Sequence, residues 1–373
     1  MEYRKLRVII SGGGTGGHIF PALSIANKLK ELNPETEILF VGAEGRMEME
    51  KVPAAGYKIV GLPITGLQRR LDLSNFALPF KILKSIRMAK KLIREFKPDI
   101  AIGVGGYASA PTLKMATKLG YSTILQEQNS YPGVTNKILA DGVNRICVAY
   151  ENMERWFPAN KIVFTGNPIR QNISFLENNL TEIKNKALST FNITSDKPVV
   201  LVVGGSLGAL TINESIINNL EYFEKNNIQL IWQTGKWFFE KAKEKVAQIN
   251  SSNIKVYDFI YEMEQAYSLA DVIISRAGAI AISELCIVGK PCILVPSPNV
   301  SEDHQTKNAN ALVTKSAAIM VRDVESREKL IVELDSLINN KALQQEMSAN
   351  ITKLGIRDAD KRIVEQIELI LNK

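Results

Sequence analysis

Short apolar runs alternate with longer amphipathic stretches along the first half of the chain. Runs with strand character occupy residues 6–11, 37–42, 57–62, 99–106, 122–129 and 145–150. Helical patterns lie between them, the first from about Ile19 to Asn33 and a long basic one from about 74 to 96. Continuous Val, Ile and Leu strands separated by helices are typical of a parallel sheet covered on both faces. The pattern therefore predicts an α/β fold.

The same pattern restarts after residues 163–170. A polar, Asn-rich stretch runs to about Lys197, and the segment 198–209 then repeats an apolar strand, a glycine loop and a helix. Further strands, each ending in a loop, are expected within 229–235, 253–260, 271–278 and 291–298. We expect two Rossmann-like domains, 1–168 and 169–345, followed by a helical segment at 346–373.

Composition narrows the class of protein. The chain has 373 residues, 45% apolar and 23% charged, which is typical of a globular protein of about two domains. No apolar run approaches the roughly 18 residues of a spanning helix, and the chain opens directly into a glycine loop, so neither a membrane span nor a secretory signal is expected. The net charge of +7 suits a protein that handles anions.

Metal and redox chemistry are not expected. Cys147, Cys286 and Cys292 lie in apolar segments without a CxxC pair, which favours reduced core residues in a cytoplasmic protein. The chain has two histidines, too few for a His-rich metal site. The DxD motif formed by Asp358 and Asp360 lies in a charged helical stretch, where a solvated helix face is the better interpretation.

The loops that follow the strands carry the candidate chemistry, because ligands bind at the carboxyl ends of parallel strands. The first loop, GGGTGGH (12–18), contains GxGxxG through Gly12, Gly14 and Gly17. Glycines allow close backbone approach to an anion, and the following helix N-terminus supplies free N–H groups. His18 lies at this helix start, where a near-neutral pKa suits proton abstraction from a hydroxyl.

The second half offers a matching set of loops. Ser206 in GGSLGA (204–209) can donate to a phosphate, and Gly278 permits a turn before a helix that contains Glu284. A carboxylate there suits a ribose diol, although a solvated helix glutamate is equally consistent with the sequence. Gln305 and Asn308, three apart on one helix face, suit contact with sugar hydroxyls.

Seven motifs occur together and in order: GGGTGGHIFPALSIA, GVGGYAS, QEQNSYPGVTNK, TGNPIR, VVGGSLGA, SRAGAIAISE and HQTKNA. Over about 300 residues the chain resembles the MurG family of peripheral-membrane glycosyltransferases. These enzymes add N-acetylglucosamine (GlcNAc) to undecaprenyl-pyrophosphoryl-MurNAc-pentapeptide (lipid I), giving lipid II for peptidoglycan synthesis and cell wall biogenesis. The resemblance implies two Rossmann-like domains facing a cleft, the glycosyltransferase B fold, with a C-terminal helix that packs back on the N-terminal domain.

The resemblance also assigns roles. Thr15, Gly16 and Gly17 would face the diphosphate and the acceptor, Asn129 the donor, and Arg170 and Ser206 the nucleotide diphosphate. Ile260 would hold the uracil through its backbone, and Gln305 would read the GlcNAc hydroxyls. The residues that would line the diphosphate and ribose are Ala279, Ile280, Ala281, Ile282, Ser283 and Glu284. The chain departs from the family pattern at Ala281 (commonly Thr), His304 (commonly Gln) and Gln126 (commonly His).

The implied reaction is attack of the acceptor C4 hydroxyl on C1 of UDP-GlcNAc with inversion, without metal or cofactor. His18 is the candidate base and Glu127 the next. The implied partners are UDP-GlcNAc, lipid I and an anionic membrane surface at the cytoplasmic face of the inner membrane, and not nucleic acid. Three alternatives remain open: a UDP-GlcNAc 2-epimerase of the same fold, an NAD-dependent dehydrogenase using Glu44, and a non-catalytic binding protein.

The long basic stretch is a candidate membrane surface. Six basic residues and no acidic one lie between Lys81 and Arg94. The sequence predicts that one face packs on the sheet, comprising Ile82, Ile86, Ala89, Ile93 and Phe96. Phe76, Leu78, Phe80 and Leu83 fall partly outside that stripe and could enter the lipid interface while the basic residues meet anionic headgroups.

Overall fold

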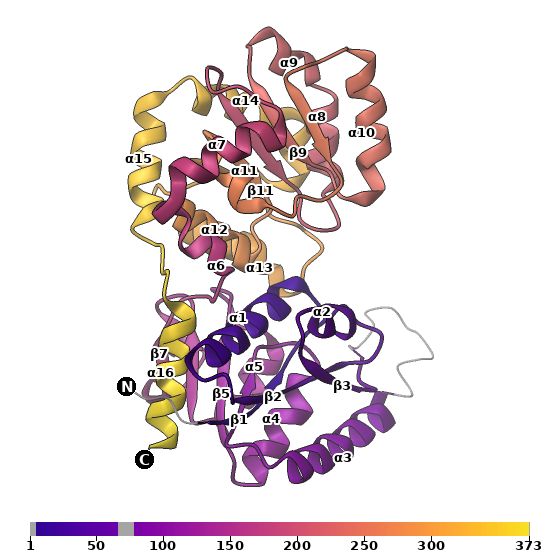
Figure 1. Ribbon diagram of the computed structural model, residues 1–373, viewed down its shortest axis with the longest axis vertical. Coiled ribbons are helices and arrows are strands. Elements are labelled where there is room, and N and C mark those ends of the chain that lie inside the picture. Colours follow the sequence, from indigo (N-terminus) through magenta and orange to yellow (C-terminus); the bar gives the residue numbers. More distant parts are fainter. Residues whose placement is uncertain (1–4, 66–77, 373) are drawn as a thin grey trace. The chain divides into compact units, whose positions relative to one another are not determined.

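The computed structural model describes residues 5–65 and 78–372, and these form two compact units. Unit 1 comprises Met1–Arg170 and Asp358–Lys373, and unit 2 comprises Gln171–Arg357 (Figure 1). Each unit is an α/β domain built on one parallel sheet, as the sequence predicted. None of the helices in the described part combines the length and hydropathy needed to cross a bilayer.

Unit 1 contains a seven-stranded sheet of order β3-β2-β1-β4-β5-β6-β7. Its strands are β1 (Arg7–Ser11), β2 (Glu37–Ala43), β3 (Lys58–Leu62), β4 (Ile100–Gly103), β5 (Ser122–Glu127), β6 (Arg145–Val148) and β7 (Ile162–Phe164). Its helices are α1 (Gly16–Leu32), α2 (Glu48–Ala54), α3 (Leu78–Phe96), α4 (Ser109–Lys118), α5 (Val134–Leu139) and α16 (Ala359–Leu371). The order reverses between β1 and β4, so their loops meet at the switch point where open α/β sheets bind ligands.

The side chains of successive residues of β1 point to opposite faces of this sheet. Val8 and Ile10 pack with α1 and α16, whereas Ile9 packs with α3 and α4. Such a strand is buried on both sides, which is why it is a continuous apolar run. The terminal helix α16 lies along α1 and inserts buried aliphatic side chains beneath it (Figure 1).

Unit 2 repeats the arrangement with a six-stranded sheet of order β10-β9-β8-β11-β12-β13. Its strands are β8 (Val199–Val203), β9 (Gln229–Gln233), β10 (Ile254–Tyr257), β11 (Val272–Ser275), β12 (Cys292–Leu294) and β13 (Ile319–Met320). Its helices are α6 (Gln171–Ser174), α7 (Leu180–Phe191), α8 (Leu210–Ile217), α9 (Leu220–Lys225), α10 (Lys236–Gln248), α11 (Met263–Leu269), α12 (Ala279–Val288), α13 (His304–Val313), α14 (Ser326–Ile338) and α15 (Lys341–Thr352). The switch point lies between β8 and β11.

Some limits differ from those expected from the sequence. The polar stretch 171–197, for which the sequence predicted no helix or strand, is not without structure: it forms α6 and α7, and α7 packs on α11 within unit 2. The segment from 346 does not act as one terminal element either, because α15 packs on α12 and α14 of unit 2 while α16 belongs to unit 1. Helix α1 begins at Gly16, three residues before the expected Ile19.

The exposure of the side chains tests two predictions, one for the three cysteines and one for the DxD motif. Cys147, Cys286 and Cys292 are buried and unbonded, as predicted, and burial raises the pKa of Cys147 and of Cys286 to about 12. The solvated-face interpretation is wrong for Asp360, which is 9% exposed at the start of α16, where burial raises its pKa. Asp358 just before it is exposed, as expected.

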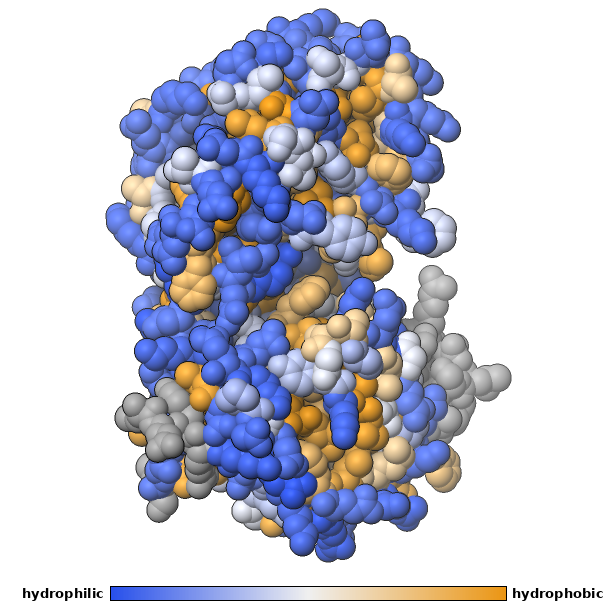
Figure 2. All heavy atoms as spheres, viewed as in Figure 1, coloured by the Kyte–Doolittle hydropathy of each residue, from blue (hydrophilic) through white to orange (hydrophobic). Residues whose placement is uncertain are grey.

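Helix α3 presents apolar side chains to solvent. Ala89 and Ile93 are buried against the sheet as predicted, but Ile82 is 40% exposed and does not belong to the buried face. Phe80 and Leu83 are 77% and 46% exposed. In Figure 2 hydrophilic and apolar side chains lie side by side along the edge where Figure 1 places α3. The predicted residues 74–77, including Phe76, lie outside the described residues.

Candidate functional site

The first glycine loop uses its early amides to hold itself in place. The N–H groups of Gly12, Gly13 and Gly14 donate to Val41 O (3.2 Å), Gly105 O (3.3 Å) and a carboxylate oxygen of Glu48 (2.8 Å). Gly13 and Gly14 have φ of 146° and 87°, a region that favours glycine. These amides are therefore not open to a ligand, contrary to a simple phosphate-cradle interpretation of GxGxxG.

The backbone N–H groups that have no partner in the described part of the chain follow directly after Gly14. Helix α1 begins at Gly16 after the extended Thr15, and the first N–H groups of a helix have no partner within it. Among the described residues no hydrogen bond satisfies the N–H of Thr15, Gly16 or Gly17. Together with the positive end of a 17-residue helix, they form an anion-binding position.

His18 lies in the first turn of α1 with its imidazole folded back on the loop. Its Nδ1 is 2.9 Å from Gly13 O and 3.3 Å from Thr15 Oγ1. A carbonyl only accepts, so Nδ1 carries the proton and Nε2 holds the free lone pair. A Cβ built on Gly105 would lie 2.9 Å from Nε2, so the absent side chain there leaves room for the ring.

The protonation state of His18 suits a base. Burial of the imidazole lowers the pKa of His18 below its ordinary value of 6.5, while the Gly13 carbonyl and the charges of Glu127 and Glu48 act in the opposite direction. The neutral form therefore dominates at neutral pH. Nε2 can accept a proton from a hydroxyl placed beside it.

Glu127, the second candidate base, instead organises the QEQN loop. Its carboxylate accepts hydrogen bonds from Asn129 N (2.9 Å), Asn129 Nδ2 (3.1 Å), Gly133 N (3.1 Å) and Asn136 Nδ2 (2.8 Å). Four donors satisfy both oxygens of a side chain that is 1% exposed. The geometry favours Glu127 as the residue that positions Asn129 over a role as proton acceptor.

Buried amides support the same loop from beneath. Gln126 Nε2 donates to Asn167 Oδ1 (2.9 Å), and Asn167 Nδ2 donates to Gln128 O (3.0 Å). Gln126, which departs from the family's usual histidine, is therefore a fully buried structural amide. Arg170, three residues beyond Asn167, is the last residue of unit 1 before the chain enters unit 2.

In unit 2 the second glycine loop packs tightly against the loop after β9. A Cβ on Gly208 would lie 2.1 Å from Thr234 O, and one on Gly235 would lie 2.5 Å from Gly208 N. Ser206 is exposed at the tip of the loop. The two glycines therefore permit a close approach that presents Ser206 to solvent.

Gln233, which the sequence did not single out, joins this loop to the segment of Ile260, which is expected to hold the uracil. Its Nε2 donates to Gly205 O (3.1 Å), and its Oε1 accepts from Ile260 N (2.9 Å). The Ile260 N–H is thus already committed, and its side chain is buried. Only the Ile260 carbonyl remains to face a ligand. The signal that the sequence offered for Gln233 was a glutamine at the end of an apolar strand.

Helix α12 supplies a second N-terminus at the switch point. It begins at Ala279 after the extended Gly278, and Arg276 N reaches across to Val203 O (3.4 Å). Ile280 and Ile282 are buried, so their side chains belong to the core and only their backbone can serve a ligand. Ala281 and Ser283 are half-buried, and Ser283 Oγ donates to Ala279 O (3.0 Å).

Glu284 is not a solvated helix residue. It is 4% exposed, and its carboxylate accepts a hydrogen bond of 3.2 Å from the hydroxyl of Tyr267, which is also buried. Burying an ionisable group costs free energy unless it has polar partners. Glu284 therefore lies buried within the second turn of α12, with the Tyr267 hydroxyl as one polar partner.

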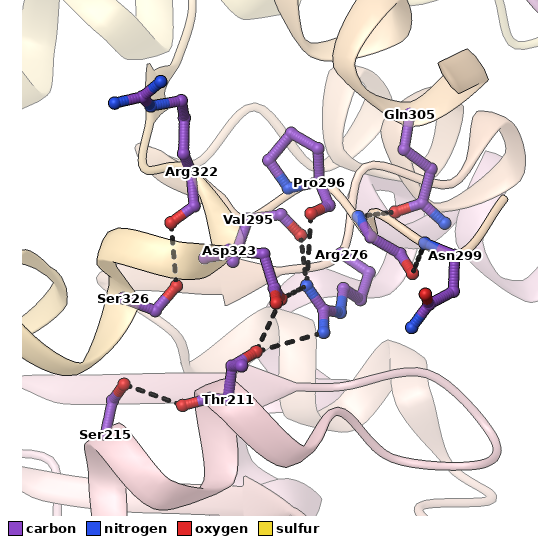
Figure 3. A network of polar contacts seen from close by, with 11 residues as sticks. Thr211, Ser215, Arg276, Val295, Pro296, Asn299, Gln305, Arg322, Asp323 and Ser326 are labelled. Atoms are coloured by element: carbon purple, nitrogen blue, oxygen red, sulfur yellow. Dashed lines mark hydrogen bonds and ion pairs between the residues drawn. The ribbon is translucent and has the colours of Figure 1, made fainter. Parts of the chain in front are cut away.

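Arg276, two residues before Gly278, connects the segments that follow β12 and β13 to the start of α8 (Figure 3). It forms an ion pair with Asp323, and both side chains are largely buried. The guanidinium also donates to the carbonyls of Val295 (3.1 Å) and Pro296 (3.3 Å) and to Thr211 Oγ1 (3.3 Å). This network was not predicted, because its members are brought together only by the sheet.

Gln305 lies in the first turn of α13, close to the same loops. Its Oε1 accepts from Ser297 N (2.8 Å), which fixes the amide (Figure 3). Asn308, expected on the same helix face as Gln305, is fully buried. His304 precedes Gln305 at the start of the helix.

The sequence-predicted residues thus fall into two groups. Unit 1 brings Thr15, Gly16, Gly17 and His18 together beside the loop of Glu127 and Asn129, and also contains Arg170. Unit 2 joins the loops of Ser206 and Ile260 through Gln233, and it contains Ala279–Glu284 and Gln305. Within the described residues, no three His, Cys, Asp or Glu side chains cluster as a metal site would require.

Two parallel-sheet α/β domains, each with a glycine loop at its switch point, are the architecture of the glycosyltransferase B fold. The chain belongs to glycosyltransferase family 28: the N-terminal domain model of this family matches residues 8–148, and the C-terminal domain model matches residues 199–363. The crystal structure of MurG from Acinetobacter baumannii is similar, with a TM-score of 0.78 and 30% identity over 98% of this chain and 99% of that one.

Curated relatives extend over the full length. A protein of Parabacteroides distasonis is 54% identical over 99% of this chain and 100% of its own, and one of Cytophaga hutchinsonii is 55% identical over 100% and 98%. Both are named UDP-N-acetylglucosamine–N-acetylmuramyl-(pentapeptide) pyrophosphoryl-undecaprenol N-acetylglucosamine transferase. A UDP-GlcNAc 2-epimerase from Neisseria meningitidis has a TM-score of 0.68 at 16% identity over 97% of this chain and 99% of that one, which shows a shared fold.

Proposed function

We propose that the chain transfers GlcNAc from UDP-GlcNAc to the C4 hydroxyl of MurNAc in lipid I, forming lipid II for peptidoglycan synthesis, on which cell shape and division depend. The proposal is supported most directly by the position of His18 in a chain with a close full-length relative. A histidine with a free Nε2 lies beside an open helix N-terminus in a chain that is 54% identical, over its whole length, to a protein named for this transfer.

The donor would bind unit 2. The Ile260 carbonyl can accept from the uracil N3–H, and the Glu284 carboxylate can accept from the ribose hydroxyls. The first-turn N–H groups of α12, from Ala279 to Ala281, would meet the diphosphate, with Ser206 donating from the second loop. Ala281 offers its N–H alone, because it lacks the hydroxyl that a threonine would supply.

The acceptor would bind unit 1. Its diphosphate would face the open N–H groups of Thr15, Gly16 and Gly17, which places its sugar near His18. Asn129, held by Glu127, and Arg170 would contact the donor's sugar and diphosphate. Held in this way, the reacting hydroxyl needs no further ordering at the moment of reaction.

In the reaction, the C4 oxygen forms a bond to C1 of GlcNAc while the bond from C1 to the diphosphate oxygen breaks, with inversion at C1. The hydroxyl proton passes to Nε2 of His18, and the bonding electron pair leaves with UDP. The positive end of α12 and Arg170 would stabilise the charge on the departing diphosphate.

We also propose that α3 attaches the enzyme peripherally to the cytoplasmic face of the inner membrane. Phe80, Ile82 and Leu83 are exposed beside Lys84 and Arg87. Exposed apolar side chains with basic neighbours suit the interface of an anionic bilayer. This would place the active site next to an acceptor that has a polyprenyl tail.

A transfer assay tests the proposal. The purified chain is incubated with labelled UDP-GlcNAc and a lipid I analogue, and a parallel sample omits the acceptor. We expect label in the lipid product only when the acceptor is present. Conversion of UDP-GlcNAc to its 2-epimer without acceptor would instead favour the epimerase, whose likeness to this chain extends only to the fold.

A further inference from the structure

Glu48, in the first turn of α2, is a buried carboxylate without a cationic partner. Its side chain is 1% exposed, and no Lys, Arg or His forms an ion pair with it among the residues described. A buried, unpaired charge is costly and persists only where other groups stabilise it. The Glu48 carboxylate therefore needs other polar groups to stabilise it.

Two backbone amides supply that stabilisation, one from each side. Oε2 accepts from Gly14 N at 2.8 Å, and Oε1 accepts from Ala43 N at 2.9 Å. Two glycines make room for the side chain: a Cβ on Gly13 would lie 2.2 Å from the carboxyl carbon, and one on Gly42 would lie 2.5 Å from Cγ. The carboxylate therefore bridges the end of β2 and the first glycine loop.

The first glycine loop, which Glu48 bridges to β2, also holds His18, the proposed general base. Gly13, which packs directly on the Glu48 carboxylate, provides the carbonyl that receives His18 Nδ1–H at 2.9 Å. Gly106 packs on the other side, where a Cβ would lie 2.4 Å from Gly13 O. A shift of the Gly13–Gly14 peptide would move the acceptor that orients the imidazole.

We propose that Glu48 is a positioning residue for the transfer: it fixes Gly13 and Gly14 so that the Gly13 carbonyl holds His18 with Nε2 directed at the acceptor hydroxyl. This inference rests on the proposed function, in which His18 is the base. By occupying the Gly14 amide, Glu48 also makes Thr15 the first open donor of the helix N-terminus.

The charge of Glu48 has a second effect on the same histidine. The charged groups facing the His18 imidazole are Glu127 and Glu48, and both favour its protonated form. Proton abstraction turns His18 into an imidazolium. Glu48 therefore helps to stabilise the product of the proton transfer as well as the position of the ring.

The test compares Glu48→Gln with Glu50→Gln. Glu50 is an exposed carboxylate on the same helix, so its variant removes an equal charge without touching the loop. The readouts are the NMR titration of the imidazole protons without substrate and the kinetics of transfer. The chain has two histidines, so His304 of unit 2 serves as the internal reference.

For Glu48→Gln we expect kcat to fall by about 10- to 100-fold, the range typical of removing a group that orients a functional side chain. The KM for UDP-GlcNAc and the His304 titration should not change. The His18 pKa should fall, because a negative charge that favours the imidazolium is gone. Glu50→Gln should match the wild type in every readout.

Unchanged kcat in Glu48→Gln, or a lower kcat with an unmoved His18 titration, would overturn the proposal. If Glu48→Gln does not fold, Glu48→Asp decides. Its shorter side chain keeps the charge but cannot reach both amides, so kcat should still fall, and a wild-type kcat would overturn the proposal. If the wild type transfers no GlcNAc while Glu48→Gln moves the His18 titration, the proposed function fails and the Glu48–His18 linkage stands.

Discussion

At the scale of single residues, the proposed chemistry depends on a hydrogen bond that selects one nitrogen of His18. Because Gly13 O accepts from Nδ1, the basic lone pair is on Nε2. The residue type and its position at a helix start were visible in the sequence. The tautomer was not, since it depends on the left-handed conformation of Gly13 and on contacts with Gly105 and Glu48.

His18→Ala should lower turnover by about 10²–10⁴-fold, the contribution of a general base. The affinity for UDP-GlcNAc should stay nearly constant, because the base acts on the acceptor hydroxyl and is not among the residues proposed to contact the donor. Transfer kinetics at saturating acceptor and calorimetric titration with UDP-GlcNAc measure the two effects. More than about a third of wild-type turnover would exclude His18 as the base.

The pH dependence should follow the neutral imidazole. Burial lowers the pKa of His18 from 6.5, so the neutral imidazole is the majority form at pH 6.5 and above. We expect the acid limb of kcat/KM to be centred below pH 6.5, where the base becomes protonated. A profile of kcat/KM against pH with its acid limb centred above pH 6.5 would contradict this assignment.

Glu284→Ala should weaken donor binding by about 1.5–3 kcal/mol, the range for hydrogen bonds to a charged group. Discrimination between UDP and its 2′-deoxy or 3′-deoxy ribose analogues should shrink as well. Tyr267→Phe is the matched control, because it removes the hydroxyl that donates the 3.2 Å hydrogen bond to Glu284 and leaves the carboxylate in place. Equal discrimination in Glu284→Ala and the wild type would remove Glu284 from the ribose.

At the scale of elements, the buried parallel strands were predictable and the edges were not. Strands β1 and β8 are continuous apolar runs because both faces are covered, so the sequence predicted them closely. Strands β7 and β13, with three and two residues, carry too little pattern to be recognised. The ion pair of Arg276 and Asp323 could not be predicted, since 47 residues separate its members.

The prediction for a single element concerns α3 and its binding to a membrane surface. Reversing Lys81, Lys84 and Arg87 to Glu should abolish sedimentation with anionic vesicles, because each basic residue near such a surface contributes about 1 kcal/mol. UDP-GlcNAc binding should remain intact. Vesicle binding of the wild type should weaken with salt, since the attraction is electrostatic.

The matched control reverses three exposed lysines on α10 of unit 2: Lys241, Lys243 and Lys245. Both triple variants lower the net charge of +7 equally, so only the location of the change differs. The α10 variant should sediment like the wild type. Equal loss in both variants would indicate attraction by net charge alone, and unchanged binding of the α3 variant would exclude that helix.

At the scale of the whole molecule, the chain leaves unit 1 after Arg170 and returns to it with α16. Ile363, Val364 and Ile367 of this helix are almost completely buried with α1. The final helix is therefore part of the core of unit 1 that α1 covers. Its composition predicted a helix, whereas the expectation that it packs on the N-terminal domain followed only from the resemblance.

Ile367→Ala should lower the free energy of unfolding of unit 1 by about 2–5 kcal/mol, the cost of truncating a fully buried aliphatic side chain. Leu369→Ala on the same helix is the control, because Leu369 is 57% exposed and its loss should cost within about 0.5 kcal/mol. Denaturant unfolding of the two variants measures the difference. Equal stability would show that α16 does not belong to the core of unit 1.

The most direct test of the central claim is a structural analysis of the product. The chain is incubated with UDP-GlcNAc and a lipid I analogue, UDP release is counted, and the lipid product is examined by mass spectrometry and NMR. The account predicts one GlcNAc added per UDP released, joined to the C4 oxygen of MurNAc in the β configuration. A product with the α configuration, a different linkage position, or UDP release without a disaccharide would contradict it.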